Sequence, residues 1–578
     1  MADALQTIQE VIRFWGKEKP NAEVFTFVNK HGRVGVCTPR DIWDHSLRFA
    51  SLLRQTYGFA AGDVIANGLP NSPERLITDM GIILAGCIMV NCQVLEKDGS
   101  DFWNTACVAQ CKGVVLAVSD TSAPYCLFRQ FLSQASTSGT TGLQPIEGLA
   151  QVTTSHAPEL TKAILVNRSR TEEPIQIQGS FMDRTRAIEE PIELPLPLSR
   201  PDDIVVLFAT SGSSGFCKLI PRTHREILDA ARSFQGGKDG RYFSDRPFGW
   251  MGGFPFDFLA YCSVRVLQDQ FAGEEASSCN DIWAVIGREN CTAAAMVPGT
   301  IHELIRHFEN ERPEFVLSAI VTSGQPLRES LSKALGLLTH AMVAAYSSTE
   351  AGMVCASVVT SAHQMVDFFS GRPIPGVQVK IVDEDGVELP HGKDGQVLVK
   401  SIRNLQSYYR QPEETKALFQ TDGWLKTGDR GWLDQAGNFY CLGRTGDAVL
   451  QGSVVIYSSW PEGILSKSPD VAQVSVVAVP TASKEKALCA CVVPVEGSGL
   501  TEEKLMKFYK DSFFGGGASS SAEAEAELAS NSAASPKQPR GFVIELKKIV
   551  LLDELPKTLT GKVNKKELVS VASSAIAE

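Results

Sequence analysis

No apolar run in the 578-residue sequence approaches the roughly 20 residues that a membrane helix needs. Positive charge is not in excess, since 55 Lys and Arg stand against 66 Asp and Glu, and a net charge of −11 argues against broad nucleic-acid binding. The 14 cysteines form no CxxC pair, so we expect reduced core thiols. Neither a signal peptide, a transit peptide nor a C-terminal peroxisomal signal is recognisable, and a cytoplasmic enzyme is expected.

Several signatures of enzyme sites are also missing. The sequence contains no GxGxxG fingerprint, no Walker A spacing and no GxSxG elbow, which disfavours dinucleotide folds, P-loop NTPases and serine hydrolases. The segment HELIRH suggests a metalloprotease helix. Its two histidines, His302 and His307, are five residues apart rather than four, so a helix places them about 140° apart. A surface or half-buried helix is the better interpretation.

The pattern of apolar residues changes along the chain. Strand-like runs alternate with helical patterns over residues 1–130 and 201–365, which is typical of a parallel sheet with crossover helices. Residues 134–200 are irregular and rich in Ser, Thr, Glu and Pro. Residues 370–442 alternate apolar and polar residues between turns such as DG and HGKDG, which predicts hairpins and a small barrel.

These patterns predict an α/β fold with two domains. Residues 1–443 are expected to form a large multilayer α/β N-terminal domain with a small β-barrel subdomain. Residues 444–578 are expected to form a smaller, mobile α+β C-terminal domain. Within it, residues 515–536 are low in complexity and are expected to be a disordered insertion.

Residues 208–221, FATSGSSGFCKLIP, are the strongest candidate for a binding loop. They begin at the end of the apolar run IVVLF, which predicts a buried strand. Gly212 and Gly215 permit positive φ and close backbone approach, and consecutive amides can form an anion-binding concavity. Hydroxyl donors and one lysine complete the pattern, namely Thr210, Ser211, Ser213, Ser214 and Lys218. A nucleotide polyphosphate is the simplest ligand, and a flexible Ser/Gly loop is the alternative.

A second segment, STSGTTG at residues 136–142, looks even more like a phosphate loop. It has no strand-like run before it and no lysine within reach after it. It follows residues 126–134, whose pattern is more typical of a helix. We therefore interpret it as a surface loop.

Further fragments could complete a nucleotide site. After the run AMVAA, a strand end would offer Tyr346 for stacking on a base. Thr349 and Glu350 would face a metal-bound phosphate, since Mg²⁺ prefers oxygen ligands. Asp429, in the segment TGD, could accept hydrogen bonds from two ribose hydroxyls, and Lys562 ends the glycine-hinged segment PKTLTGK. Each fragment alone is more often a surface loop or a solvated lysine.

Taken in order, these fragments resemble the adenylate-forming superfamily of acyl-CoA synthetases, luciferases and peptide-synthetase adenylation domains. The resemblance extends from about residue 8 to about residue 570. Its motifs are GDVIANGLPNSPE, the loop at 208–221, SGQPL at 323–327, YSSTE at 346–350, GRPIPG at 371–376, DGWLKTGDRGWLDQAGNFYCLGR at 422–444 and PKTLTGK at 556–562. Such a series in one order is highly specific.

The resemblance implies that a carboxylic acid reacts with ATP and Mg²⁺ to give an acyl-adenylate, which then reacts with the thiol of coenzyme A. It implies roles for the matching residues: the loop amides and Lys218 on the β- and γ-phosphates, Thr349 and Glu350 on the α-phosphate and Mg²⁺, Gly324, Gln325 and Tyr346 around adenine, Asp429 and Arg444 on the ribose, and Lys562 on the α-phosphate and the carboxylate. In the family, the C-terminal domain rotates between the two half-reactions.

The chain departs from the family pattern at several positions. Cys217 and Leu219 flank the loop lysine where Pro and Gly are usual, and PFGW at 247–250 replaces PLFH. Gly446 stands at the hinge position, where the family usually has an acidic residue or Lys. In GSVVIYSSWPE at 452–462, Ser453 replaces a glycine and Ser458 a proline. Because this segment lies by the thiol channel in the family, the resemblance implies that these departures bear on the second half-reaction more than on the first.

The identity of the acid is not written in the sequence. Trp250 and Met353 are candidates for the wall of an acyl pocket and favour an apolar tail, although they could equally be core residues. Two alternatives to a coenzyme A ligase stay open. One is an adenylation enzyme that loads a carrier protein in trans, and the other is a binding protein that keeps the nucleotide site without turnover.

Overall fold

The computed structural model resolves the chain into two compact units. One comprises Met1–Met296, Glu303–Ile320 and Leu405–Ala417, and the other comprises Val297–His302, Val321–Asn404 and Leu418–Glu578. The structure describes residues 4–91, 94, 99–134, 148–168, 180–188, 199–210, 218–233, 240–271, 279–420, 422–451, 454–480, 486–514, 544–557 and 563–577. The loop residues 211–217, the look-alike loop at 136–142, the segment at 515–536 and Lys562 lie outside these described residues.

The first unit contains an eight-stranded sheet with the strand order β10-β9-β4-β3-β5-β8-β7-β6. The strands are β3 Val64–Asn67, β4 Ile88–Asn91, β5 Gly113–Ala117, β6 Leu132–Gln134, β7 Leu149–Val152, β8 Lys162–Val166, β9 Ile204–Thr210 and β10 Lys218–Thr223. The central strands β9, β4, β3, β5 and β8 are parallel. This is the parallel sheet that the alternating pattern predicts.

Helices cover both faces of that sheet. Helices α4 Ser100–Ala109 and α5 Ala123–Phe128 share one apolar core with strands β3, β4, β5 and β8. Helix α3 Pro73–Leu84 packs on β3 and β4, and α2 Pro39–Ser51 packs on α3. The local sequence determines where α2 and α3 begin, because Thr38 and Ser72 cap these helices and a proline follows each cap.

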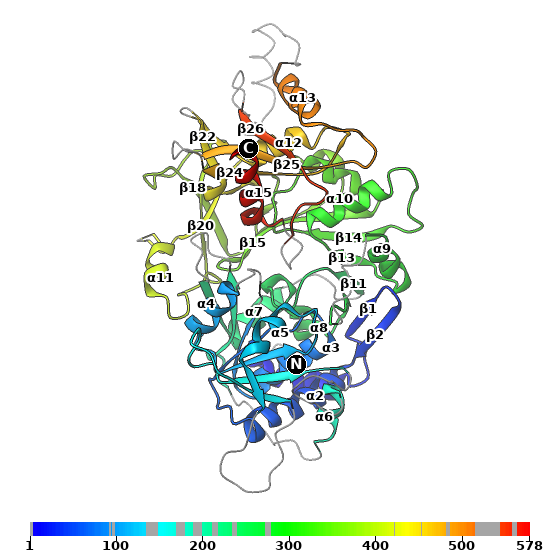
Figure 1. Ribbon diagram of the computed structural model, residues 1–578, viewed down its shortest axis with the longest axis vertical. Coiled ribbons are helices and arrows are strands. Elements are labelled where there is room, and N and C mark those ends of the chain that lie inside the picture. The colour runs from blue at the N-terminus through cyan, green and yellow to red at the C-terminus, as the bar shows by residue number, and fades with distance from the viewer. Residues whose placement is uncertain are drawn as a thin grey trace. The chain divides into compact units, whose positions relative to one another are not determined.

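The remaining strands of the first unit lie in the order β13-β11-β12-β1-β2, and the β1–β2 hairpin is drawn in dark blue in Figure 1. Their bounds are β1 Phe25–Asn29, β2 Gly32–Cys37, β11 Arg241–Ser244, β12 Val264–Gln268 and β13 Ala293–Ala295. The other helices up to residue 307 include the HELIRH helix, which the two units share: α1 Ile8–Glu18, α6 Phe181–Arg186, α7 His224–Ser233, α8 Phe256–Tyr261, α9 Cys279–Arg288 and α10 Pro298–His307. Strand β14 Leu317–Thr322 contains the boundary between the units.

One local expectation was wrong in part. Residues 126–134 are helical only at their start, where α5 Ala123–Phe128 and the 3₁₀ turn Arg129–Phe131 precede the strand β6 Leu132–Gln134. The backbone of Leu132 pairs with Val152 of β7. Strand pairing with a distant segment therefore overrides the local helical pattern.

The second unit is built on antiparallel strands. Strands β15 Thr339–Ser348, β16 Gly352–Val359 and β17 Arg372–Pro373 pair in sequence. The strands of the expected small barrel form a four-stranded sheet, β18 Val377–Val382, β19 Gly395–Ser401, β20 Leu425–Leu433 and β21 Phe439–Arg444. Tyr346 and Cys355 share an apolar core with Val397 and Phe439, so the β15–β16 hairpin packs on this sheet.

The C-terminal part of this unit has its own core. Strands β22 Ala448–Gln451 and β23 Val454–Tyr457 pair with each other, and β24 Val471–Pro480, β25 Lys486–Pro494 and β26 Leu546–Leu551 form a sheet. Helices α12 Ser459–Leu465 and α13 Glu502–Phe514 cover one face, and α15 Lys565–Ala577 covers the other. Helix α11 Pro412–Leu418 belongs to the first unit up to Ala417. The fold is therefore the mixed α/β architecture with a smaller C-terminal part that the sequence predicts.

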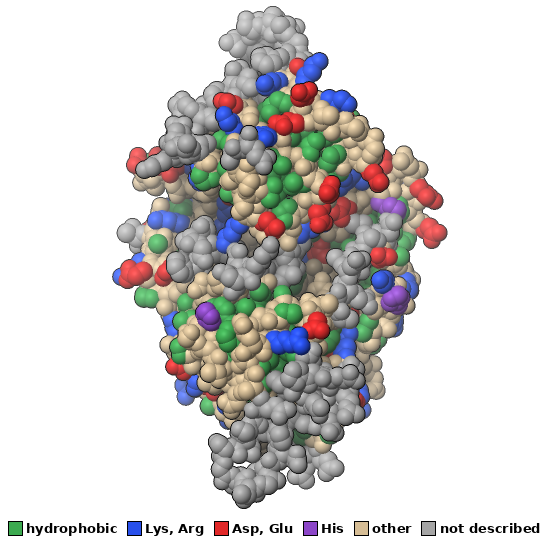
Figure 2. All heavy atoms as spheres, in the orientation of Figure 1, with side chains coloured by type: hydrophobic (Ala, Val, Ile, Leu, Met, Phe, Trp, Pro, Cys, Tyr) green, Lys and Arg blue, Asp and Glu red, His purple; other side chains and the backbone are tan. Residues whose placement is uncertain are grey.

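Three general features agree with the composition. Cysteines within the described ranges are free thiols, and most of them are buried. Basic and acidic side chains are interspersed over the face shown in Figure 2. Among the helices that the structure describes, none has both the length and the apolar character of a membrane span.

Candidate functional site

The predicted site residues fall into two groups, one in each unit. Thr210, Lys218 and Trp250 belong to the first unit. The second unit holds Gly324, Gln325, Tyr346, Thr349, Glu350, Met353, Asp429 and Arg444. Each group is brought together by the fold of its own unit.

In the first unit, both ends of the candidate phosphate loop are fixed by strand pairing. Strand β9 ends at Thr210, and β10 begins at Lys218, which is the antiparallel partner of Thr210. The Thr210 hydroxyl donates a hydrogen bond to the Lys218 carbonyl, with an oxygen–oxygen distance of 3.4 Å. The residues between them, Ser211 to Gly215 included, lie outside the described residues. The loop is thus a strand-to-strand connection with a lysine at its exit.

Trp250 lies in a tight turn that follows β11. The Trp250 amide donates to the Pro247 carbonyl at 3.0 Å, and the Phe254 amide donates to the Trp250 carbonyl at 2.8 Å. Phe254 packs edge-on against Phe208 of β9, with ring centroids 5.8 Å apart. The turn that carries Trp250 therefore lies beside the strand that leads into the phosphate loop.

Asn71 fastens this turn from the other side. Its side-chain amide donates to the Arg246 carbonyl at 3.3 Å, and its side-chain oxygen accepts from the Phe248 amide at 2.9 Å. The residue is only 7% exposed. Asn71 belongs to the segment LPNSPE, which the sequence flagged as family-like without assigning it a role. Because the residues in this contact are more than 170 positions apart, no local sequence pattern reveals it.

A buried polar network also lies beneath the turn. Arg75 donates to the side-chain oxygen of Asn91 at 3.0 Å and pairs with Asp79 at 2.8 Å. Burial raises the pKa of Asp79, although the neighbouring Arg75 opposes this effect. A Cβ atom at Gly249 would come within 2.1 Å of the Asn91 side chain. Glycine at 249 is therefore required for the close approach of the turn to this network.

Arg265 holds the backbone at the end of the same turn by hydrogen bonds. Its guanidinium donates to the Gly253 carbonyl at 2.5 Å and to the Phe254 carbonyl at 3.2 Å, and it pairs with the buried carboxylate of Asp257. Its Nε donates to the Tyr242 hydroxyl at 2.7 Å. Such a charge, 3% exposed, is tolerated because it is both paired and hydrogen-bonded. The backbone around Trp250 is thus fixed by side chains that the sequence pattern does not reveal.

In the second unit, Asp429 is the centre of a compact polar cluster. Its carboxylate accepts a hydrogen bond from the Tyr346 hydroxyl at 2.6 Å and pairs with Arg444 at 3.3 Å. Asp429 and Arg444 are direct partners across β20 and β21, so the sheet register brings them together. Arg444 also donates to the Thr427 carbonyl at 3.1 Å. The motifs TGD and GR, which are 15 residues apart, thus form one structural element.

The pKa values of this cluster reflect its burial and its charges. Burial raises the pKa of Asp429, although Arg444 and the Tyr346 hydroxyl oppose it, and the charge of Glu350 adds to the increase. The Asp429 carboxylate raises the pKa of Arg444, and Glu350 contributes there as well. Burial, followed by Asp429, raises the pKa of Tyr346 well above its ordinary value. The charge of Glu350 therefore acts on both Asp429 and Arg444.

Thr349 and Glu350 lie in the turn between β15 and β16, and both are half-buried. Their hydroxyl and carboxylate are oxygen donors of the kind that Mg²⁺ accepts. Tyr346 was expected to offer its ring to a base. The ring is 7% exposed and packs against Phe439 with centroids 5.0 Å apart. The hydrogen bond from the Tyr346 hydroxyl to Asp429 is the contact that the sequence did not predict.

Gly324 and Gln325 follow β14, and Gly324 has a φ of +90°, which only glycine adopts readily. The next residue, Pro326, is 4.0 Å from a Cβ atom built at Gly443. The segment SGQP therefore lies beside the strand end that carries Arg444. Met353, on β16, is 37% exposed and is one of the few large apolar side chains on the surface of this unit.

The hinge position Gly446 has open space around it. A Cβ atom at Gly446 would meet nothing within 4 Å, so glycine is not required there for space. The neighbouring Asp447 pairs with Lys565 at 2.9 Å, and the same ammonium group lies 3.3 Å from the Ser458 hydroxyl. Burial lowers the pKa of Lys565, but the carboxylates of Glu462 and Asp447 raise it more. Ser458, which replaces the usual proline, thus contributes a hydrogen-bonding group.

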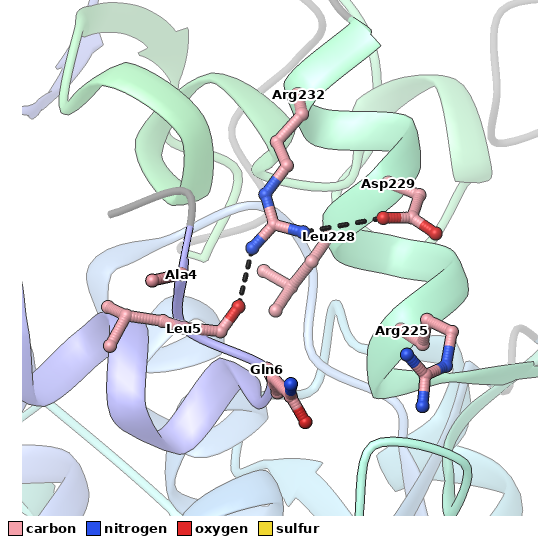
Figure 3. Close-up of a pocket in the computed structure, with 7 residues that line it drawn as sticks. All are labelled: Ala4, Leu5, Gln6, Arg225, Leu228, Asp229 and Arg232. Atoms are coloured by element: carbon pink, nitrogen blue, oxygen red, sulfur yellow. Dashed lines mark hydrogen bonds and ion pairs between the residues drawn. The ribbon is translucent and has the colours of Figure 1, made fainter. Parts of the chain in front are cut away.

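A separate hollow of about 210 Å³ lies in the first unit (Figure 3). It is lined by Ala4, Leu5, Gln6, Arg225, Leu228, Asp229 and Arg232. Arg232 donates to the Leu5 carbonyl at 2.5 Å and pairs with Asp229 at 3.3 Å. Arg225 pairs with Asp202 at 2.7 Å. Its arginines are engaged by the protein, and it contains none of the predicted site residues, so this hollow is a junction between the N-terminal segment and α7.

Two family descriptions match the chain. "AMP-binding enzyme" matches residues 12–409, and "AMP-binding enzyme C-terminal domain" matches residues 462–562. The first match alone covers well over half of the 578 residues. The chain belongs to the family of AMP-binding enzymes, which confirms the resemblance to the adenylate-forming superfamily.

The relatives include coenzyme A ligases of different kinds. The chain is 24% identical over 552 residues to a long-chain-fatty-acid–CoA ligase of Escherichia coli O6:H1, with 92% of this chain and 90% of that protein covered. It is 22% identical to a 2-hydroxy-7-methoxy-5-methyl-1-naphthoate–CoA ligase of Streptomyces carzinostaticus, with 90% and 86% covered.

Solved structures share the fold. The crystal structure of the anthranilate CoA ligase AuaEII with anthranoyl-AMP matches with a TM-score of 0.74 at 19% identity and covers 100% of both chains. ATP-bound MatB from Rhodopseudomonas palustris matches with a TM-score of 0.70 at 19% identity and covers 99% of this chain and 100% of its own. At such identities the likeness concerns the fold.

Proposed function

We propose that this protein is an ATP-dependent acid–thiol ligase that activates a carboxylic acid as an acyl-adenylate and transfers the acyl group to coenzyme A. The observation that carries the proposal is the buried Asp429 carboxylate, held by the Tyr346 hydroxyl and Arg444. Each carboxylate oxygen can accept more than one hydrogen bond, so Asp429 has capacity left for ribose hydroxyls. Family membership supports the same nucleotide.

In the first half-reaction, a carboxylate oxygen of the acid forms a bond to the α-phosphorus of ATP, and the bond to the bridging oxygen of pyrophosphate breaks. Both reactants are anions, so the site has to supply positive charge and fixed donors. Lys218 and the amides of Ser211, Gly212, Ser213, Ser214 and Gly215 would hold the β- and γ-phosphates. Lys562 would lie on the α-phosphate and the carboxylate. Mg²⁺ on Thr349 and Glu350 would neutralise phosphate charge.

In the second half-reaction, the thiol of coenzyme A loses its proton and its sulfur bonds to the acyl carbon, while the bond from that carbon to AMP breaks. Gly324 and Gln325 would border the adenine throughout. The acid is proposed to be fatty or otherwise apolar. The half-buried Trp250 and the partly exposed Met353 support this choice because both offer apolar surface. The relatives' names favour coenzyme A as the thiol.

A panel of carboxylic acids tests this proposal. The protein is incubated with ATP, Mg²⁺, coenzyme A and each acid, pyrophosphate is measured, and products are identified by mass spectrometry, with a holo-carrier protein in a parallel arm. We expect pyrophosphate and acyl-CoA with at least one apolar acid. Asp429→Asn should abolish both, whereas Asp422→Asn, an exposed aspartate of the same motif, should not. Acylation of the carrier alone would contradict coenzyme A as the acceptor.

A further inference from the structure

Leu219, which replaces the usual glycine after the loop lysine, is anchored on every side. Its side chain is fully buried in the core that the eight-stranded sheet shares with α4 and α5. It pairs with Ala209 of β9, and its own amide donates to the side-chain oxygen of Gln411 at 2.9 Å. Its carbonyl accepts from the Tyr409 amide at 2.8 Å. The residue that follows Lys218 therefore has a fixed backbone.

The segment that provides these contacts comes from far along the chain. Residues 405–417 belong to the first unit although the chain on either side of them belongs to the second. Strand β10 lies at the edge of its sheet, and an edge strand has unpaired backbone groups. Tyr409 and Gln411 cover that edge at Leu219. Gln411 and Leu219 are 192 residues apart in the sequence.

Tyr408 presents its ring to the loop lysine. The Lys218 ammonium lies 5.3 Å from the centroid of the Tyr408 ring, within the distance of about 6 Å at which a cation–π attraction operates. Tyr408 is 3% exposed, and its amide donates to the Thr415 hydroxyl at 3.0 Å. A buried ring whose backbone is held by a hydrogen bond is a rigid support for a long and flexible side chain.

One residue of this segment has a strained backbone conformation. Arg410 has a φ of +57°, a left-handed conformation that is unfavourable for a residue with a side chain. The turn is closed by the Gln411 amide on the Tyr408 carbonyl at 3.4 Å and by the Thr415 amide on the Gln411 carbonyl at 3.1 Å. The strained residue thus lies between Tyr409 and Gln411, the two residues that hold Leu219.

We infer that residues 408–411 form a positioning device for the phosphate loop and that Tyr408 is the positioning residue for Lys218. The inference rests on the proposed function, because it assumes that Lys218 binds the phosphates of ATP. Tyr409 and Gln411 fix the backbone next to Lys218, and the ring of Tyr408 limits the directions in which its ammonium group points. Lys218 is thereby pre-ordered, and less conformational entropy is lost when the polyphosphate binds.

The test compares Tyr408→Leu with Tyr408→Phe, which retains the ring. ATP affinity is measured by calorimetry without acid, and the KM values for ATP and acid are measured by pyrophosphate release. We expect Tyr408→Leu to weaken ATP binding about three- to fivefold and to leave the KM for the acid unchanged. Tyr408→Phe should bind ATP like the wild type. In a Lys218→Gln background, Tyr408→Leu should have almost no further effect on ATP affinity.

Other outcomes overturn the inference. An equal loss in Tyr408→Phe and Tyr408→Leu, or the same loss with and without Lys218, would reduce Tyr408 to a structural residue. ATP binding without pyrophosphate release for any acid would contradict the proposed function, while the affinity cycle would still decide the role of Tyr408. A wild-type protein that does not bind ATP would overturn both.

Discussion

At the scale of the residue, Asp429 is the centre of the polar cluster in the described part of the second unit. The sequence suggested Asp429 as an acceptor for ribose hydroxyls, but it did not predict the two residues of the protein that contact its carboxylate. The Tyr346 hydroxyl and the Arg444 guanidinium each occupy one carboxylate oxygen. Burial raises the pKa of Asp429, whereas these two partners favour its charged form and fix its orientation.

Tyr346→Phe tests this arrangement. The variant removes the hydroxyl but keeps the ring against Phe439, so the effect is confined to the hydrogen bond. A hydrogen bond to a charged group is worth about 1.5–3 kcal/mol, and we expect the KM for ATP to rise about tenfold in the pyrophosphate assay. Tyr440→Phe is the control, because the Tyr440 hydroxyl contacts Asp434 on the same sheet. Equal effects of the two substitutions would contradict a specific role for Tyr346.

His224 makes a different kind of prediction. It is 1% exposed, and its Nδ1 accepts a hydrogen bond from the Ile8 amide at 3.2 Å, which requires the neutral ring. Burial lowers its pKa from 6.5 to about 4. Between these values the unfolded chain binds the proton more readily than the folded chain, so stability falls as pH falls from about 6.5 to about 4.

The substitution His224→Asn should keep an acceptor and remove this titration. Wild-type protein is expected to lose about 2 kcal/mol more stability than the variant between pH 7 and pH 5, as measured by urea unfolding. His391→Asn, at an exposed position, serves as the control and should follow the wild type. A variant whose stability declines with acid as steeply as that of the wild type would refute this role of His224.

At the scale of the element, the turn at 247–254 shows what the sequence can and cannot predict. The substitution of PFGW for the usual PLFH was visible in the sequence, and so was the prospect that Trp250 lines an acid pocket. The clamps on that turn were not visible. Asn71 comes from the loop before α3 and Asn91 from the end of β4, both far from the turn in sequence, and the requirement for glycine at 249 follows from the position of the Asn91 side chain.

Two alanine substitutions in this turn form a matched pair. A Cβ atom at Gly249 would collide with Asn91, whereas one at Gly252 would meet nothing within 4 Å. Neither glycine has a positive φ that would itself penalise alanine. We expect Gly249→Ala to move the turn and to change the KM for the acid at least severalfold, with a smaller change for ATP. Gly252→Ala should resemble the wild type. The same KM for the acid in both variants would contradict a role of this turn in acid binding.

The same contrast holds for the phosphate loop. The alternation of apolar runs predicted β9 and placed Thr210 at its end, because a buried strand followed by a glycine-rich segment is a local signal. The order of the later motifs, through the family resemblance, predicted that one nucleotide site contains Tyr346, Asp429 and Arg444. The contact of Tyr408 with Lys218 and the hold of Gln411 on Leu219 could not be predicted, because they depend on where a segment some 190 residues away returns to its sheet.

At the scale of the whole molecule, the two proposed half-reactions would place different demands on the chain. Each unit contains some of the residues proposed for adenylation, and the last of these residues, Lys562, lies outside the described residues. The resemblance implies that this segment serves adenylation in one arrangement and thioester formation in another. Loss of Lys562 should therefore affect one half-reaction only.

Lys562→Ala is expected to reduce acyl-adenylate formation by at least about a hundredfold, because a charge on the reacting phosphate and carboxylate is removed. Thioester formation from supplied acyl-adenylate should remain largely intact. The two half-reactions are followed by pyrophosphate release and by acyl-CoA formation, with Lys557→Ala as a control on the same segment. Equal loss of both half-reactions would contradict the assigned role of Lys562.

The central claim is that this protein joins a carboxylic acid to AMP. The most direct measurement is the detection of protein-bound acyl-adenylate by mass spectrometry after incubation with ATP, Mg²⁺ and each acid of a panel, without any thiol. The account predicts an acyl-adenylate for at least one apolar acid, with one pyrophosphate released for each adenylate formed. ATP binding without acyl-adenylate or pyrophosphate for any acid would contradict it.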